Sequence, residues 1–247
     1  MAIENKVSDK IKNFQKFAEQ DVSAAISELK KIKKDENRKH LQRLVYANLI
    51  DRFDVLIDEL LLELATLPNN SFHTRVLLKV SDIPVSQKDF YEVMVSNDAK
   101  KVIEEQIKNI VRSEFIRSRH SAKLRVLLED GFEVEKNQLN KSRVNANDGR
   151  VQTTFKRRSV TVPSTVIGYS DYLYARRSGI VHGTGTSISK QDTDYLTKTF
   201  DAKTKAIGIK LSSVLSAAQF YKHLTEFMLT EMWPPSRNHQ PKNNKNN

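Results

Sequence analysis

The stretch Tyr172-Leu-Tyr-Ala-Arg-Arg-Ser-Gly-Ile-Val-His182, followed by Gly183, ends a largely apolar segment with cationic and polar residues. This composition predicts a helix whose last turn carries Arg177 and His182 and whose stop residue is Gly183. Cationic side chains in a last helical turn suit the negative end of the helix dipole. One interpretation of the stretch is therefore an ordinary helix C-terminus.

Arg177 and His182 also combine two groups that can act on a phosphodiester. A guanidinium fork pairs with phosphate oxygens, and an imidazole exchanges protons near neutral pH. RNA supplies its own nucleophile, the ribose 2′-hydroxyl, so this chemistry needs no metal or other cofactor. The spacing of five places the two side chains about 140° apart around a helix. We therefore expect them to flank a substrate rather than share one face, and one chain to form an incomplete site.

The segment Arg177-Ser-Gly-Ile-Val-His182 resembles the motif of the HEPN superfamily, in which an arginine, followed by a polar residue, precedes a histidine by a short spacer. The preceding Arg176 and the trailing Val-His-Gly-x-Gly are similar to a common form of this motif. Ser178 stands where that form has asparagine, and it keeps a short polar side chain without the planar amide.

The order of segments between about residues 44 and 226 is also similar to that of prokaryotic HEPN proteins of the RiboL-PSP or MAE-type groups. Those proteins begin with a long amphipathic helix, continue with a Ser-rich helical middle that ends in Leu-x-x-x-Gly, and finish with a long helix after the motif. The corresponding segments here are residues 41–67, 96–132 and 207–232.

The resemblance implies an all-α, HEPN-like helical bundle and a metal-independent endoribonuclease, acting as a toxin or an antiphage abortive-infection effector. It implies that His182 is the general base or acid and that Arg177 binds and polarises the scissile phosphate. Ser178 would orient the pair, and Arg176 would assist. The implied partners are RNA, a second copy in a homodimer with a composite active site, and an antitoxin or activator protein. A non-catalytic dimer that binds nucleic acid or a partner protein is the alternative.

Composition supports a nucleic-acid partner and a soluble protein. Lysine and arginine outnumber aspartate and glutamate by 41 to 30, which gives a formal net charge of +11 in 247 residues. Clustered cations displace the counterions of a phosphate backbone, although many basic proteins carry such charge only for solubility. The chain has no cysteine, and we recognise neither a signal peptide nor a membrane-spanning run, so we expect a cytoplasmic location.

Hydrophobic spacing divides the chain into three parts. Residues 1–40 predict a charged helical extension, residues 41–232 the HEPN-like domain, and residues 233–247 a disordered tail. Within the domain, residues 71–85 suit either a short helix or a strand. Residues 132–163 predict a polar and basic insertion, in which Val151–Phe155 and Ser159–Val162 alternate like a small hairpin.

Two long helices are predicted outside the motif, and each has a distinctive face besides its main apolar stripe. The helix at residues 41–67 carries Asp51, Asp54 and Asp58 opposite its apolar stripe, and we expect a solvated acidic face rather than a cation site. The last helix is apolar on more than one side. Such a helix is either deeply buried or shared with a partner subunit.

Two basic clusters are candidate contacts for a phosphate backbone. One follows a predicted helix end, where its cations exceed what capping requires, and the other lies in the insertion. A mobile basic loop there would suit substrate binding, and a plain insertion is equally compatible. The six candidate RNA-binding residues are Arg117, Arg119, Lys123, Lys156, Arg157 and Arg158.

Overall fold

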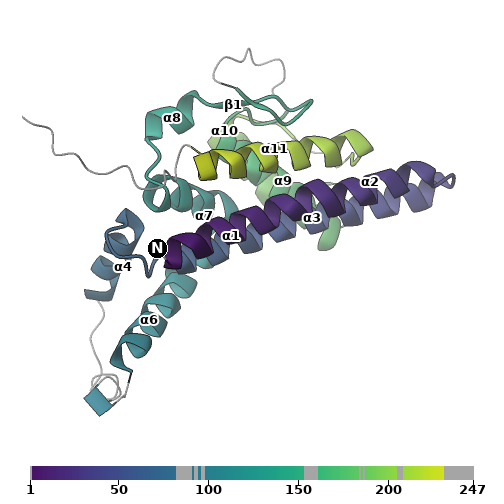
Figure 1. The fold of residues 1–247 in the computed structure, drawn as a ribbon. Coiled ribbons are helices and arrows are strands. Elements are labelled where there is room, and N and C mark those ends of the chain that lie inside the picture. Colours follow the sequence, from purple (N-terminus) through teal and green to yellow (C-terminus); the bar gives the residue numbers. More distant parts are fainter. Residues whose placement is uncertain are drawn as a thin grey trace, which may run out of the picture.

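The computed structural model describes residues 2–81, 91, 94–95, 98–152, 161–183, 185, 187–204 and 208–230. This part of the chain is mostly helical, so the prediction of an all-α fold is confirmed (Figure 1). The larger helices are α1 (Ala2–Lys16), α2 (Val22–Lys31), α3 (Asp35–Leu64), α4 (Ser71–Ser81), α6 (Ala99–Ile110), α7 (His120–Val126), α8 (Lys136–Lys141), α9 (Val166–Val181), α10 (Lys190–Phe200) and α11 (Leu211–Thr230). Three π-helical segments continue helices, η1 (Phe17–Asp21), η2 (Val111–Ile116) and η3 (Leu127–Gly131), and the strands are β1 (Arg143–Val144) and β2 (Val151–Gln152).

The long helix α3 is the element on which most of the others pack, including α1, α2, α7, α9 and α11. It begins six residues earlier than its apolar stripe predicts, because Asp35 and Glu36 place negative charge at the positive end of the helix dipole. It spans 30 residues and ends at Leu64, shortly before Pro68 and Asn69, whose φ is +66°. At about 1.5 Å per residue it provides a scaffold roughly 45 Å long.

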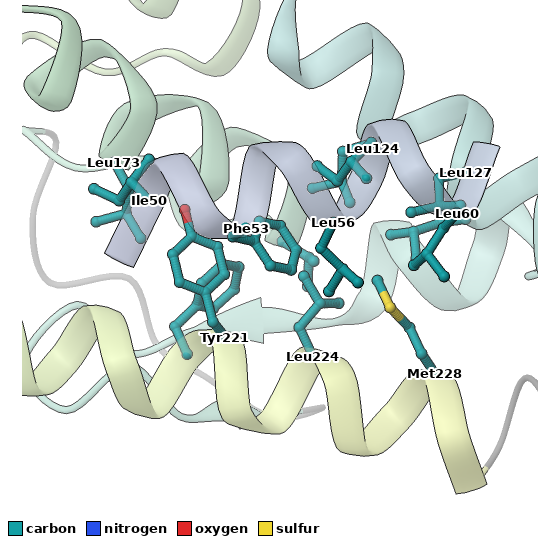
Figure 2. Packing of buried hydrophobic residues seen from close by; sticks show 14 of the residues in the cluster. Ile50, Phe53, Leu56, Leu60, Leu124, Leu127, Leu173, Tyr221, Leu224 and Met228 are labelled. Atoms are coloured by element: carbon teal, nitrogen blue, oxygen red, sulfur yellow. The ribbon is translucent and has the colours of Figure 1, made fainter. Parts of the chain in front are cut away.

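The terminal helix α11 is buried within the chain. Its apolar side chains lie against α3 and α1, and the rings of Phe53 and Tyr221 stack with their centroids 4.1 Å apart. Figure 2 shows this packing, in which the labelled side chains of α11 are Tyr221, Leu224 and Met228 and those of α3 include Ile50, Phe53, Leu56 and Leu60. Each large apolar side chain buried in this way contributes about 1.5–3 kcal/mol. One apolar face of α11 is thus buried within the chain, whereas Leu215 on another face is 48% exposed.

The N-terminal helices belong to the same hydrophobic core. Figure 1 shows α1 and α2 running along α3, and Val7, Ile11 and Phe14 face inward with almost no exposed surface. The ring of Phe14 lies 5.4 Å from that of Phe53, centroid to centroid. Residues 2–31 are thus part of the main domain instead of an extension to it, because their apolar stripe is buried only by packing on α3 and α11.

The insertion before the motif helix differs from the predicted hairpin. Val151 and Gln152 pair with the earlier residues Val144 and Arg143, in antiparallel register. The turn between the strands closes at Gly149, whose φ is +75° and at which a Cβ would lie 1.9 Å from the Ser216 carbonyl oxygen of α11. A short helix, α8, also occupies part of the insertion. Residues 153–160, which include half of the second predicted strand, lie outside the described residues.

Three further features concern individual helices. Residues 71–81 form α4, so the helical interpretation of that ambiguous segment is correct for the residues described. Ser189 caps α10, where its hydroxyl accepts a hydrogen bond from the amide of Asp192. In the described portion of the chain, none of the helices combines the length and the apolar character that crossing a membrane requires.

Candidate functional site

The helix that carries the motif, α9, lies against α3, α7 and α10. Thr165 caps its N-terminus by accepting a hydrogen bond of 3.1 Å from the Gly168 amide. At the other end, Gly185 has a φ of +73° and donates its N–H to the Gly179 carbonyl at 3.1 Å. A Cβ at Gly183 would lie 2.8 Å from the same carbonyl oxygen. The chain therefore turns back tightly after His182. Both Gly183 and Gly185 allow this turn, whereas the sequence predicted Gly183 alone as the stop residue.

Arg177 and His182 come into contact at this helix end. The Arg177 Nη1 lies 3.4 Å from the His182 Nε2, and the imidazole is exposed. An ideal helix would separate the two side chains by about 140°. The helix ends at Val181, and His182 is its C-cap residue, whose N–H still donates to the Ser178 carbonyl at 2.9 Å. The long side chain of Arg177 therefore spans this separation to reach the imidazole. The two side chains thus meet, although their spacing predicted that they would not share one face of the helix.

A carboxylate from α3 completes this group. Asp51 forms an ion pair with the Nε of Arg177, and the guanidinium also lies over the Tyr174 ring at 5.9 Å from its centroid. The side chains of Asp51 and Arg177 are 39% and 18% exposed, so both reach solvent. The sequence predicted only that Asp51 lies on a solvated face of the helix. The motif group defined by Arg177, His182 and Asp51 thus contains a guanidinium, an imidazole and a carboxylate.

Arg176 lies inside the fold, although the sequence suggested an assisting role. Its guanidinium contacts the faces of Tyr46 and Tyr172 and donates a 2.7 Å hydrogen bond to the Gly208 carbonyl. The residue is only 7% exposed. Successive residues of a helix point about 100° apart, so an outward Arg177 leaves its neighbour directed inward. This arrangement gives Arg176 a structural role.

Ser178 lies at the edge of a polar hollow of about 310 Å³, which we call the α7 hollow. Its walls come from α3, α7, α9 and the start of α10. The residues around it include Asp54, Asp58, Arg117, Arg119, His120, Lys123, Tyr174, Ser178 and Asp192. Among the described residues, no hydrogen bond joins the Ser178 hydroxyl to Arg177 or His182, so the expected orienting contact is absent from this part of the structure.

Lys123 lies inside this hollow and is paired with two carboxylates. Its Nζ lies 2.9 Å from Asp54 and 2.7 Å from Asp58, and the residue is 4% exposed. Burial alone would lower the pKa of Lys123, but the charges and hydrogen bonds of these aspartates outweigh burial and raise it. Lys123 is therefore charged and already neutralised. The two aspartates are likewise engaged, and the expected solvated acidic face is wrong at these positions.

His120 is a site residue that sequence reasoning did not select. Its Nδ1 lies 2.7 Å from Asp54 and its Nε2 lies 2.9 Å from the Ser170 hydroxyl, and its ring stacks on Tyr174 with centroids 4.7 Å apart. Both His120 and Ser170 are almost fully buried. Through this stacking the network fixes the position of the Tyr174 ring, which in turn contacts the Arg177 guanidinium. The only sequence signal was the histidine within the basic cluster that follows η2.

The other five candidate RNA-binding residues differ in their surroundings. Arg119 donates to Asp171 at 2.8 Å and also pairs with Asp192 at 3.0 Å, and its guanidinium stacks on Tyr195 at 3.8 Å from the ring centroid. It joins α7 to α9 and α10 and is not a free cation. Arg117 is exposed at the rim of the α7 hollow. Lys156, Arg157 and Arg158 lie outside the described residues.

Comparisons with known proteins add no relative: no family model matches the chain, and neither the curated proteins nor the solved structures contain a match. Across the described residues, no group of three or more His, Cys, Asp or Glu side chains has the arrangement of a metal site.

Proposed function

We propose that this protein is a metal-independent endoribonuclease in which the ribose 2′-hydroxyl attacks the adjacent phosphate. The observation that carries the proposal is the contact between the Arg177 guanidinium and the exposed His182 imidazole at the end of α9. By the resemblance to HEPN proteins, its biological role is that of a toxin or an antiphage abortive-infection effector.

The chemistry follows from the two side chains. A guanidinium can donate two hydrogen bonds to the non-bridging oxygens of a phosphodiester and stabilise the charge that builds on them in the transition state. An imidazole can transfer a proton to or from a ribose oxygen. Their separation of 3.4 Å allows both to reach one phosphate. The formal net charge of +11 favours association with RNA.

A non-catalytic helical dimer that binds nucleic acid or a partner protein is the second candidate. The observation that favours it is the ion pair between Arg177 and Asp51, which already neutralises part of the charge of the guanidinium. Incubating the purified protein with total RNA in the presence of EDTA separates the two. Cleavage that persists in the chelator and disappears in His182→Ala supports the enzyme, whereas intact RNA at high protein concentration supports the binding protein.

Arg177→Ala is expected to abolish cleavage while leaving the protein folded. Alanine is the better helix former, and a half-exposed ion pair contributes at most about 1 kcal/mol. Arg177→Lys keeps the charge but loses the fork, so its activity should lie between those of the wild type and the alanine variant. Cleavage rates and urea unfolding curves measure both effects. A loss of stability that matches the loss of activity would assign Arg177 to structure.

We further propose that the protein acts as a homodimer with the motif helices on facing surfaces. Supporting this, exposed apolar side chains lie along the outer face of α3 that also carries Asp51, and Val181 is 47% exposed directly before His182. This outer α3 stripe consists of Leu41, Leu44 and Val55. A second copy seated on the stripe would cover it and bring two motif groups toward each other, as the composite site of HEPN proteins requires.

Leu44→Glu tests this interface. Leu44 is 50% exposed, so the charge should change the stability of the protomer by no more than about 0.5 kcal/mol but disfavour a buried contact between copies. Light scattering after size-exclusion chromatography should give a dimer mass for the wild type and a monomer mass for Leu44→Glu. Leu78→Glu, at a 64% exposed leucine of α4, is the matched control and should remain dimeric. A monomeric wild type would contradict the interface.

A further inference from the structure

The structure adds to the motif group a carboxylate that the arginine–histidine motif does not include. Asp51 comes from the middle of α3, more than a hundred residues before the motif, and its Oδ1 pairs with the Nε of Arg177. His182 contacts the same guanidinium through Nη1. The guanidinium therefore lies between a carboxylate and an imidazole, and both of these groups are accessible to solvent.

We propose that Asp51 is the general base of the reaction and that His182 is its general acid. This inference rests on the proposed endoribonuclease activity and assigns the two proton transfers. A carboxylate is ionised at neutral pH and can accept a proton, whereas an imidazolium can donate one. Asp51 would therefore touch the 2′-hydroxyl, and His182 would touch the leaving 5′-oxygen.

The position of the guanidinium is what favours this assignment. In an in-line displacement, the attacking and leaving oxygens lie on opposite sides of the phosphorus, and the charge builds on the remaining oxygens. A base and an acid on either side of the group that binds those remaining oxygens match this geometry. Asp51 contacts the Nε of Arg177 and His182 contacts its Nη1, so the two groups approach the guanidinium at different nitrogens and leave Nη2 for the phosphate.

Each proton in this reaction has a donor and an acceptor. The 2′-hydroxyl loses its proton to the Asp51 carboxylate while its oxygen forms a bond to phosphorus. The bond from phosphorus to the 5′-oxygen breaks, and that oxygen takes a proton from the His182 imidazolium. The products are a 2′,3′-cyclic phosphate and a 5′-hydroxyl, and solvent returns both side chains to their starting protonation states. Each protomer then holds both proton-transfer groups, and the second copy contributes to RNA binding.

Asp51→Asn should lower kcat/KM about 100-fold. Asparagine has nearly the same shape as aspartate and removes only the charge that is paired with the partly exposed Arg177, so the unfolding curve should change little.

A substrate with a sulfur leaving group distinguishes a base from an acid. The probe is a short RNA with a 5′-bridging phosphorothiolate at the bond that the wild type cleaves, because a thiolate leaves without protonation. We expect this substrate to restore cleavage by His182→Ala but not by Asp51→Asn. Asp51→Glu should retain part of the activity. Glu59→Gln, which replaces a carboxylate of α3 paired with Lys10, is the control and should match the wild type.

Two results would overturn the assignment. Asp51→Asn could cleave normal RNA within twofold of the wild type, or it could be rescued by the sulfur leaving group. Either outcome leaves the endoribonuclease proposal intact, because that proposal depends on wild-type cleavage and its loss in His182→Ala. A wild type that cleaves no RNA would instead remove the proposed function, and with it the role of Asp51.

Discussion

His182→Ala is expected to reduce the rate of RNA cleavage by about 100- to 10,000-fold, the range that a single proton-transfer group usually contributes. The imidazole is exposed at the end of α9, and within the described residues its side chain contacts Arg177. Truncating it should therefore leave the fold unchanged. The measurement is the initial rate of cleavage of a labelled RNA in EDTA, with circular dichroism as the test of folding.

A matched control removes an imidazole elsewhere. His223 lies on α11, half-buried, with its Nε2 2.8 Å from the Gln219 side-chain nitrogen. His223→Ala, purified in the same way, should cleave RNA at the wild-type rate. If His182→Ala retained wild-type activity, the cleavage would come from a contaminating nuclease or from other residues of the chain, and the proposed site would be wrong.

The largest effect on stability is expected for Arg119→Ala, at about 3–5 kcal/mol. Asp171 has no exposed surface, and its carboxylate accepts two hydrogen bonds from Arg119 and one from the Ser121 amide. Removing the guanidinium leaves a buried negative charge with one remaining donor. The free energy of unfolding, measured by urea titration of the helical circular dichroism signal, gives the change directly.

Two further variants make this prediction specific. Arg117→Ala removes a neighbouring arginine that is exposed, and it should change the free energy of unfolding by no more than about 0.5 kcal/mol. Adding Asp171→Asn to Arg119→Ala removes the unpaired charge and should recover part of the loss. Equal stability of the Arg117 and Arg119 variants would show that Arg119 does not hold α7, α9 and α10 together.

The difference between these two arginines illustrates what the sequence left undetermined. Arg117, Arg119 and Lys123 belong to one basic cluster, and composition treats them alike. In the structure, Arg117 lies at the surface, while Arg119 and Lys123 are occupied by aspartates of α3, α9 and α10. Whether a cation is free for RNA depends on the partners that packing brings to it, and those partners are distant in the sequence.

Local signals in the sequence determined the helical class, the long central helix, and a motif helix that ends beside His182. These features depend on hydrophobic periodicity and on contacts between residues a few positions apart. Only the tertiary structure decided that α11 is buried within the chain, that Arg176 points inward and that Asp51 pairs with Arg177. Each of these depends on which face of one helix meets another, and short-range energetics does not specify that choice.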